Sequence, residues 1–360
     1  MKTYKRLYGQ LCSLENLSLA WQKARKGKKK KDYVIEFERN LEANLKELHE
    51  DLSNCSYIPE SLSKLIIRDP KSRVIYISDF RDRIVHHAII NILSPIFEPI
   101  FIYDSFASQK RKGHHKAIQR FNYFKRKVSH NGKKLKGIKD NNYIAGYALK
   151  IDIKQYFESM AHKILIDLLS KKIKDGQFIE LIRKILRNYP AKIYGRGMPL
   201  GNYTSQFFAN VYLNELDYFC KHSLKLKYYI RYVDDIVILH NNRDFLERCF
   251  SVIKLFLKYG LQLEVHKEKS GIIPLHSGVK FLGFRIFYYY SLLKQSSIKE
   301  IKRRLDIWRG LAGLNKNEEL YKTLSSKLAG WLSHAEHGDT FKLRNGILER
   351  FNEFANPLII

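Results

Sequence analysis

The chain has 360 residues and is 45% hydrophobic, so it is long enough and apolar enough to bury a substantial core. Its 65 Lys and Arg residues outnumber 36 Asp and Glu residues, which gives a formal net charge of +29 and a pI of about 9.8. That excess is larger than solubility requires and indicates a polyanionic partner. Neither a signal peptide nor an apolar run of membrane-spanning length is evident, so we expect a cytoplasmic protein without membrane association.

Aromatic and cysteine content refine this picture. Aromatic residues make up 13% of the chain, with 23 Tyr and 21 Phe, so nucleic-acid bases can stack as well as phosphates pair. Four cysteines are widely scattered and form no CxxC pair, which indicates neither a zinc site nor a disulfide framework. We expect Cys12, Cys55, Cys220 and Cys249 to be reduced packing residues.

The N-terminal part is predicted to be helical. A basic run at residues 23–31 is either a solvated loop or a phosphate-binding segment, and the residues alone leave both open. Residues 33–52 place apolar side chains at helical spacing and predict one amphipathic helix. Two short β patterns follow, at residues 64–68 and 73–78, around a turn at 69–72.

The tip of this predicted hairpin carries two cations. Lys71 and Arg73 suit contact with a triphosphate, because exposed cations there need no burial before the ligand arrives; an ordinary exposed turn is the alternative.

An apolar helix is predicted through residues 84–93, stopped by Pro95. Paired histidines occur at 86–87 and 114–115, but adjacent histidines on a helix point apart, which disfavours a metal role.

A second basic turn precedes another helix. Lys110, Arg111 and Lys112 lie in this turn, and a helix N-terminus surrounded by cations suits a nucleic-acid backbone phosphate. Residues 128–142 are rich in Lys, Gly and Asn and predict a loop.

Two acidic centres stand out in the middle of the chain. Residues 147–153 form an alternating, mostly apolar strand that carries Asp152 near its end. Residues 228–242 read as two buried strands joined by a tight turn that carries Asp234 and Asp235. Buried acids need a partner, and a hard divalent cation with oxygen ligands is the commonest one. If the strand and the hairpin are neighbours, Asp152 and Asp234 converge and can hold two Mg²⁺ ions, with Mn²⁺ as an alternative.

The C-terminal region predicts helices. Residues 297–300 have the form of a capping box, followed by an apolar stripe through Ile301, Leu305 and Trp308. Lys302 and Arg303 lie largely off that stripe, where they can face a nucleic-acid backbone or simply solvent. Leu320, Leu324, Leu328 and Trp331 predict a second helix.

In chain order, several of these motifs resemble the palm motifs of reverse transcriptases. They are Asp152 with Phe157 five residues on, the Tyr232-Val233-Asp234-Asp235 box (YVDD), and Phe281-Leu282-Gly283-Phe284. The resemblance extends from about residue 70 to residue 348. It implies an α+β right-hand polymerase with fingers, a palm built on an antiparallel sheet with packed helices, and a helical thumb. We expect a basic helical extension at 1–60, fingers and palm at 61–290, and the thumb at 291–360.

The resemblance also implies roles for individual residues. Asp152 and Asp234 become the metal ligands, with Asp235 and the Ile153 carbonyl beside them. Phe157 matches the steric gate that favours dNTPs, and Lys71 and Arg73 match residues that hold the triphosphate. The segment Phe281, Leu282 and Gly283 matches the primer grip. Lys269 matches the lysine that protonates the leaving pyrophosphate, with Lys267 as a competitor.

One box is similar to that of reverse transcriptases from diversity-generating retroelements. Leu200 stands where most reverse transcriptases have Gln, and Gly201 is followed by Ser205 and Gln206 in the dNTP-binding box. Losing a polar clamp is expected to loosen base selection, because a mispair then forfeits less hydrogen bonding. The implied product is error-prone cDNA for mutagenic retrohoming, with errors at template adenines. Implied partners are a template RNA, a primer with its cDNA, dNTPs and a basic oligomeric accessory protein.

Two alternatives remain open. The same chemistry can serve an antiphage defence system or a group II intron-related element. A catalytically inactive nucleic-acid-binding protein with this fold is the alternative of another class, and the presence of both acidic centres argues against it.

Overall fold

The computed structural model describes residues 2–67, 73–135, 143–314 and 317–355, and the predicted turn at 69–72 with Lys71 lies outside them. The chain divides into two compact units. The first comprises Met1–Gly113, Ile151–Val237 and Glu247–Gly271; the second comprises His114–Lys150, Ile238–Leu246 and Ile272–Ile360.

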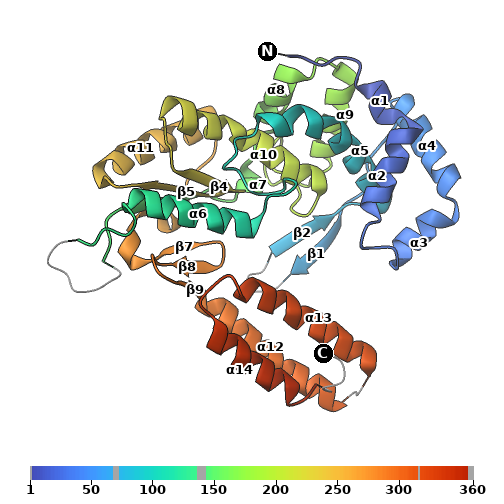
Figure 1. The fold of residues 1–360 in the computed structure, drawn as a ribbon. Coiled ribbons are helices and arrows are strands. Elements are labelled where there is room, and N and C mark those ends of the chain that lie inside the picture. The colour runs from blue at the N-terminus through green and yellow to red at the C-terminus, as the bar shows by residue number, and fades with distance from the viewer. Residues whose placement is uncertain (1, 68–72, 136–142, 315–316, 356–360) are drawn as a thin grey trace. The chain divides into compact units, whose positions relative to one another are not determined.

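Helices form the N-terminal part of the first unit (Figure 1). They are α1 (Tyr8–Cys12), α2 (Leu14–Ala24), α3 (Asp32–Arg39), α4 (Leu41–Ser53) and α5 (Phe80–Phe97), which runs into the 3-10 turn η1 (Glu98–Ile100). Ser13 caps α2, because its hydroxyl accepts a hydrogen bond from the Asn16 N–H at 3.2 Å. Leu17, Ala20 and Ala24 then form one buried face of α2, which packs along α5.

Two helix predictions need correction. The predicted single helix at 33–52 is broken at Asn40, whose φ of −125° and ψ of 44° are not helical. The Asn44 side chain donates to the Phe37 carbonyl at 2.8 Å and so satisfies an end group of α3 that the break leaves exposed. Pro95 does not stop α5, which continues to Phe97. Packing of α5 against α2 and α10 outweighs the one helical hydrogen bond that a proline removes.

The predicted hairpin is present as β1 (Ser63–Ile67) and β2 (Arg73–Ile77). The strands are antiparallel, with Ser63 opposite Ile77 and Ile67 opposite Arg73. The segment between α4 and β1 is fastened to α5 by a buried carboxyl group. Asp82 accepts hydrogen bonds from the Tyr57 hydroxyl at 2.6 Å and from the Glu60 N–H at 2.9 Å.

Asp82 predicts a pH dependence of stability. Burial raises the pKa of Asp82 to about 6, although its two hydrogen bonds act in the opposite direction. Between about pH 4 and pH 6, Asp82 is protonated in the folded state but ionised in the unfolded state. Asp82 therefore contributes fully to the free energy of unfolding below about pH 4, and this contribution is lost as the pH rises through 6. We expect the stability difference between wild type and Asp82→Asn to shift by roughly 2–3 kcal/mol between pH 4 and 7 in urea unfolding. A pH-independent difference would contradict this assignment.

The predicted strand and hairpin in the middle of the chain are confirmed as β3 (Tyr147–Asp152), β4 (Tyr229–Tyr232) and β5 (Asp235–His240). With β6 (Gly271–Pro274) they form a four-stranded sheet in the order β4-β5-β3-β6, so β3 and β5 are neighbours. The helices of this region are α7 (Tyr156–Ser159), α8 (His162–Lys172), α9 (Gly176–Arg187), α10 (Tyr203–Tyr218) and α11 (Arg243–Leu255). Five-residue π-helical turns, η2 (Phe219–Ser223) and η3 (Phe256–Gly260), extend α10 and α11.

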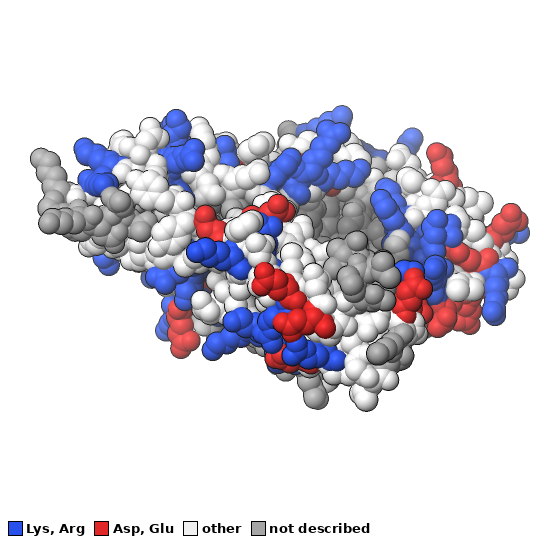
Figure 2. All heavy atoms as spheres, turned by 60° about the horizontal axis from the view of Figure 1, so that its bottom comes forward, with Lys and Arg blue, Asp and Glu red and all other residues white. Residues whose placement is uncertain are grey.

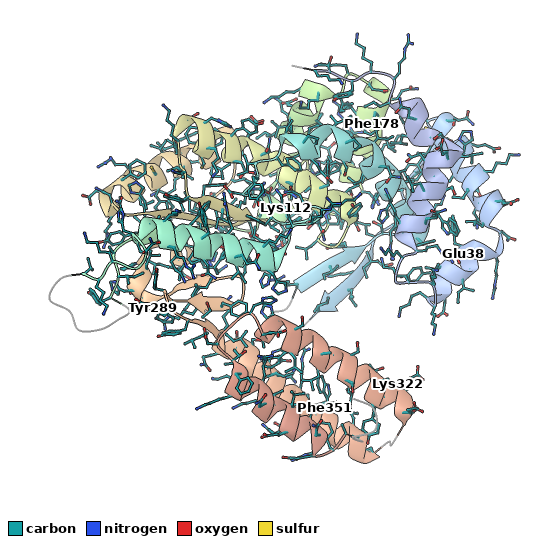
Figure 3. The ribbon with its side chains drawn as sticks, in the orientation of Figure 1. Glu38, Lys112, Phe178, Tyr289, Lys322 and Phe351 are labelled. Carbon is teal, nitrogen blue, oxygen red and sulfur yellow. The ribbon has the colours of Figure 1, made fainter. Side chains whose placement is uncertain are left out.

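The second unit contains α6 (His114–Val128) and a small antiparallel sheet of β7 (Val279–Phe281), β8 (Phe284–Ile286) and β9 (Ser291–Leu293). Its last part is a three-helix bundle of α12 (Gln295–Leu314), α13 (Glu318–Ala335) and α14 (Phe341–Asn352). Phe351 lies inside this bundle, whereas Lys322 projects from α13 into solvent (Figure 3). The predicted stripe is confirmed, because Ile301, Leu305 and Trp308 belong to the bundle core.

The predicted capping box at residues 297–300 is wrong. Helix α12 already begins at Gln295, so Ser297 lies within its first turn. The Ser297 hydroxyl instead accepts a hydrogen bond from the Trp331 indole at 3.2 Å. Glu300 accepts from Arg303 and Arg304, each at 2.7 Å, rather than from the helix N-terminus. Across the described residues, none of the helices combines the length and the apolar character that a bilayer crossing requires.

Candidate active site

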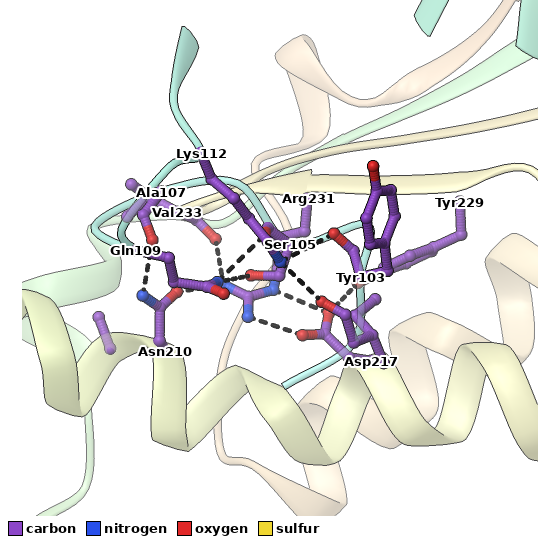
Figure 4. Close-up of polar contacts among 12 residues, drawn as sticks. Tyr103, Ser105, Ala107, Gln109, Lys112, Asn210, Asp217, Tyr229, Arg231 and Val233 are labelled. Carbon is purple, nitrogen blue, oxygen red and sulfur yellow. Dashed lines mark hydrogen bonds and ion pairs between the residues drawn. The ribbon is translucent and has the colours of Figure 1, made fainter. Parts of the chain in front are cut away.

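The turn between β4 and β5 is strained. It consists of Val233 and Asp234, and Val233 has a φ of +55°, which is unfavourable for a β-branched residue. Such a conformation persists only when its surroundings hold it. Arg231 supplies one restraint, because its Nη1 donates to the Val233 carbonyl at 3.2 Å (Figure 4).

Arg231 is itself the centre of a buried polar network. Its guanidinium and the Asp217 carboxylate are both 0% exposed, and Nε and Nη2 donate to the two Asp217 oxygens at 2.8 and 2.6 Å. Nη1 also donates to the Asn210 side chain at 3.0 Å, and the Tyr229 hydroxyl donates to Asp217 at 2.7 Å. Asp217 and Asn210 both belong to α10, so the network fastens the acidic turn to that helix.

The charge of Arg231 is secured by its partner. Burial by itself would lower the pKa of Arg231, but the attraction and hydrogen bonds of Asp217 outweigh this effect and leave the pKa raised. Arg231 was not among the residues predicted from the sequence. An arginine within the otherwise apolar run before the YVDD box was the signal, because a charge in a buried strand requires a dedicated partner.

A loop from the N-terminal half borders the same strand. The Arg231 N–H donates to the Asp104 carbonyl at 3.0 Å, and the Phe106 N–H donates to the Arg231 carbonyl at 3.0 Å. Lys112 donates to the carbonyls of Tyr103 and Ser105, both at 2.9 Å, and of Ile102 at 3.3 Å. The half-buried ammonium group is therefore engaged by this loop (Figure 4), and burial lowers its pKa.

Asp234 lies within electrostatic range of three other charged side chains. Asp152 ends β3, and the Lys269 ammonium lies 3.5 Å from its Oδ1. Burial raises the pKa of Asp234, the negative charge of Asp152 raises it further, and the positive charges of Lys269 and Arg73 lower it. The predicted pair of acids from β3 and the hairpin is thus brought into electrostatic contact, together with two of the predicted cations.

The donor set fits a hard divalent cation. Asp152 raises the pKa of Asp234, so the two carboxylates present oxygen ligands with excess negative charge, which a divalent cation would neutralise. The Ile153 carbonyl is the third predicted ligand, and its direction follows from the pairing of its neighbours. Lys154 N–H donates to Glu264 O and His266 N–H donates to Asp152 O, both at 2.8 Å, so Ile153 lies opposite Val265. Backbone groups alternate in direction, so the Ile153 carbonyl points away from that segment.

The site differs from a closed metal cage. The described part of the chain contains no group of three or more His, Cys, Asp or Glu side chains placed to hold a metal ion. Two carboxylates with a backbone carbonyl match the way Mg²⁺ binds proteins, because its remaining ligands are water and substrate phosphates. Asp235 directly follows Asp234, and its Oδ1 is buried.

Three of the predicted dNTP-binding residues, Phe157, Leu200 and Gln206, lie in or next to the segment that leads to α10. Met198 N–H donates to the Phe157 carbonyl at 2.8 Å, which links the box containing half-buried Leu200 to α7. Gln206 accepts a hydrogen bond from the Ser108 hydroxyl at 3.0 Å. Gly201 has a φ of +115°, and a Cβ there would lie 2.8 Å from the Ile75 side chain of β2, so only glycine fits between the box and the hairpin.

The predicted primer grip lies in the second unit. Leu282 and Gly283 form the two-residue turn between β7 and β8, with φ values of +45° and +88°. Two positive φ angles are characteristic of a type I′ hairpin turn. A Cβ on Gly283 would lie 3.0 Å from His334 Nε2, while Phe281 is fully buried beside the turn. The turn is therefore a rigid feature of that unit.

The paired histidines are packing residues of low basicity. Burial lowers the pKa of His86 to about 3 and of His87 to about 4. In the second unit, His114 stacks near His334 with ring centroids 4.9 Å apart, and burial lowers the pKa of His114 to about 4. These imidazoles are therefore neutral near pH 7.

The predicted backbone-binding cations differ in their surroundings. Lys110, Arg111 and Lys302 are exposed, whereas Arg303 is paired with Glu300. The face drawn in Figure 2 carries Lys and Arg in several groups, some of them adjoined by acidic side chains. On this face the positive charge is thus spread over separate groups.

Comparison with known proteins identifies the class. Residues 67–286 match the family model described as "Reverse transcriptase (RNA-dependent DNA polymerase)". That match covers more than half of the chain, and the chain belongs to this family. The predicted α+β right-hand polymerase fold is confirmed by this match and by the mixed helix and sheet structure.

Curated relatives include a group II intron-encoded protein and a further bacterial protein. "Group II intron-encoded protein LtrA" of Lactococcus lactis subsp. cremoris is 25% identical over 335 residues, covering 74% of this chain and 53% of the relative. "Protein YkfC" of Escherichia coli K12 is 24% identical over 267 residues, covering 64% of this chain and 65% of that protein. The chain spans about half the length of the first relative and contains a reverse transcriptase domain homologous to group II intron-encoded proteins.

The chain also aligns with solved structures. A telomerase from Candida tropicalis with a fragment of telomeric RNA aligns with a TM-score of 0.48 at 13% identity, covering 86% of this chain and 56% of that one. A partial Cas6-RT-Cas1–Cas2 complex aligns with a TM-score of 0.38 at 18% identity, covering 69% and 42%.

Proposed function

We propose that this chain is an RNA-directed DNA polymerase that works by two-metal phosphoryl transfer at the β4–β5 turn. The observation that carries the proposal is the position of Asp152, which ends the strand beside β5 and lies 3.5 Å from the Lys269 ammonium. Its negative charge raises the pKa of Asp234 across the same sheet. Asp152 and Asp234, with Asp235 and the Ile153 carbonyl beside them, would hold two Mg²⁺ or Mn²⁺ ions that acidify the primer 3′ hydroxyl and neutralise the triphosphate.

The chain's own groups have complementary roles in this proposal. Arg73, and Lys71 beyond the described residues, bind the triphosphate of the incoming dNTP. Lys269 donates a proton to the leaving pyrophosphate, and its position 3.5 Å from Asp152 supports this role over that of Lys267. Phe157 excludes a 2′ hydroxyl. Leu200 and Gln206 contact the dNTP, and residues 281–283 grip the primer. The template and primer backbones contact Lys110, Arg111, Lys302 and Arg303, whereas Lys112 is engaged by the carbonyls of its own loop.

We further infer that the enzyme makes error-prone cDNA for a diversity-generating retroelement. Leu200 supports this reading, because an apolar side chain replaces the polar clamp in the box before α10. Template RNA, primer and a basic oligomeric accessory protein are the proposed partners. We retain residues 1–60, 61–290 and 291–360 as the proposed extension, fingers and palm, and thumb.

The second candidate is a group II intron-related or antiphage reverse transcriptase. The similarity to a group II intron-encoded protein favours it specifically. Primer extension on an RNA template with Mg²⁺ and all dNTPs, followed by sequencing of the cDNA, separates the two. Mismatches concentrated opposite template adenine support the retroelement role, and accurate cDNA would assign the enzyme to the second candidate. If no cDNA forms even with cell extract and the native RNA, the chain is better explained as a catalytically inactive nucleic-acid-binding protein.

Leu200 itself provides a direct test. Leu200→Gln restores a polar clamp, and we expect it to lower misincorporation opposite adenine by roughly five- to tenfold, because one hydrogen bond near the dNTP is worth about 1 kcal/mol or more. Leu200→Ile is the matched apolar control and should keep the wild-type error spectrum. Equal error rates for Leu200→Gln and Leu200→Ile would refute the role of this side chain.

A further inference from the structure

A cleft of about 820 Å³ lies in the first unit, and its described lining includes none of the residues proposed above for catalysis, metal binding or dNTP binding. Its walls are the start of α8, the end of α9 and the loop at 189–195 that leads to the dNTP-binding box. The volume lies within the range that accommodates a small ligand or one to a few nucleotides.

The cleft is positively charged. Lys163, Arg183, Arg187 and Lys192 line it, and Asp167 is the acid among its lining residues. Glu180 pairs with Arg183 at 3.2 Å and with Arg187 at 3.1 Å. Both arginine side chains remain about half exposed, at 42% and 56%. Exposed pairs of this kind are weak, so a phosphate can compete for these guanidinium groups.

An exposed aromatic ring stands at the rim of the same cleft. Tyr194 is 91% exposed, and the preceding Ile193 is 63% exposed. These two side chains place an apolar surface beside the cations of the cleft. A tyrosine beside several cations is the arrangement that proteins use to bind single-stranded nucleic acid, because the ring stacks on a base while the cations pair with phosphates.

We propose that this cleft is a second nucleic-acid site, which holds a single-stranded segment of RNA outside the polymerase site. Its charge selects a polyanion, and its exposed ring selects unpaired bases over a duplex, whose bases are already stacked. Four cationic side chains against the carboxylates of Asp167 and Glu180 leave a positive surplus for the phosphates.

The cleft is connected to the dNTP-binding box by backbone hydrogen bonds. His162 N–H donates to the Gly195 carbonyl at 2.9 Å, and His162 Nε2 lies 2.6 Å from the Gly197 carbonyl, to which it donates. Gly197 N–H donates to Met160 O at 2.8 Å. An RNA segment bound in the cleft would therefore brace the loop that continues into Leu200. This coupling rests on the proposed polymerase function, whereas RNA binding in the cleft does not.

The test is equilibrium binding of a fluorescein-labelled octauridylate RNA to the full chain. A saturating unlabelled primer–template duplex first occupies the polymerase site. We expect the octamer still to bind, and Tyr194→Ala to weaken this binding at least about fivefold, as loss of one stacked base predicts. Lys163→Ala with Lys192→Ala should reduce the slope of log affinity against log salt by about 1.4, because two phosphate contacts are lost.

Matched variants separate the cleft from general surface effects. Tyr259→Ala removes a ring that is 71% exposed beside another lysine, and Lys46→Ala removes an exposed lysine; both should bind the octamer like wild type. Asp234→Asn should also bind it normally, so loss of polymerase activity is distinguishable from loss of this site. No octamer binding after duplex saturation, or equal effects of Tyr194→Ala and Tyr259→Ala, would overturn the proposal.

Discussion

Asp234→Asn is expected to abolish primer extension, lowering the rate on the order of a thousandfold or more. The substitution keeps the size of the side chain but removes a negative charge, and metal-assisted stabilisation of the phosphoryl transition state is worth several kcal/mol. The rate of single-nucleotide incorporation at saturating dNTP and Mg²⁺ is the measurement.

The same substitution should not destabilise the protein. The pKa of Asp234 is raised by burial and by the charge of Asp152, so its ionised form is unfavourable in the folded state. A neutral amide removes that repulsion, and we expect Asp234→Asn to be as stable at pH 7 as wild type or more stable in urea unfolding. Asp244→Asn, on the exposed start of α11, is the matched control and should retain full activity. Residual activity within tenfold of wild type would remove Asp234 from the catalytic centre.

Asp217→Leu is expected to have the largest effect on stability. Asp217 and Arg231 are both fully buried, so the change leaves an uncompensated charge inside the protein. Breaking one partner of a buried pair costs about 3–5 kcal/mol. The free energy of unfolding in urea should fall by that amount. Glu215→Gln, in the same helix, breaks an exposed pair with Lys171 at 3.2 Å and should cost less than about 1 kcal/mol.

A double variant separates stability from positioning. Arg231→Met together with Asp217→Leu replaces both charges with apolar groups, and we expect it to recover much of the stability lost in the single variant. The Val233 carbonyl still lacks its hydrogen bond from Arg231, so the strained turn is released and dNTP incorporation should stay low. If Asp217→Leu costs less than 1 kcal/mol, or if the double variant regains full activity, Arg231 does not hold the turn.

The amino-acid pattern alone predicted much of the active site. Alternating apolar residues predicted β3 and the β4–β5 hairpin, and an acid at the end of each marked the carboxylates proposed as catalytic. These features are local, since strand periodicity and the cost of burying a charge act over a few residues. The order of the motifs predicted the reverse transcriptase family, and the net charge of +29 indicated a polyanion before any fold was known.

Only the tertiary structure decided how these segments are held. The pairing of Arg231 with Asp217 depends on β4 lying against α10. At the break at Asn40, the Asn44 side chain donates a hydrogen bond to the exposed Phe37 carbonyl. Pro95 was misread as a helix end, and Ser297 as a cap, because helix packing and the Trp331 indole outweigh local preference. The energies of these contacts depend on residues that are distant in the sequence and that only folding brings together. The spacing of residues along the chain does not indicate which of them will be in contact.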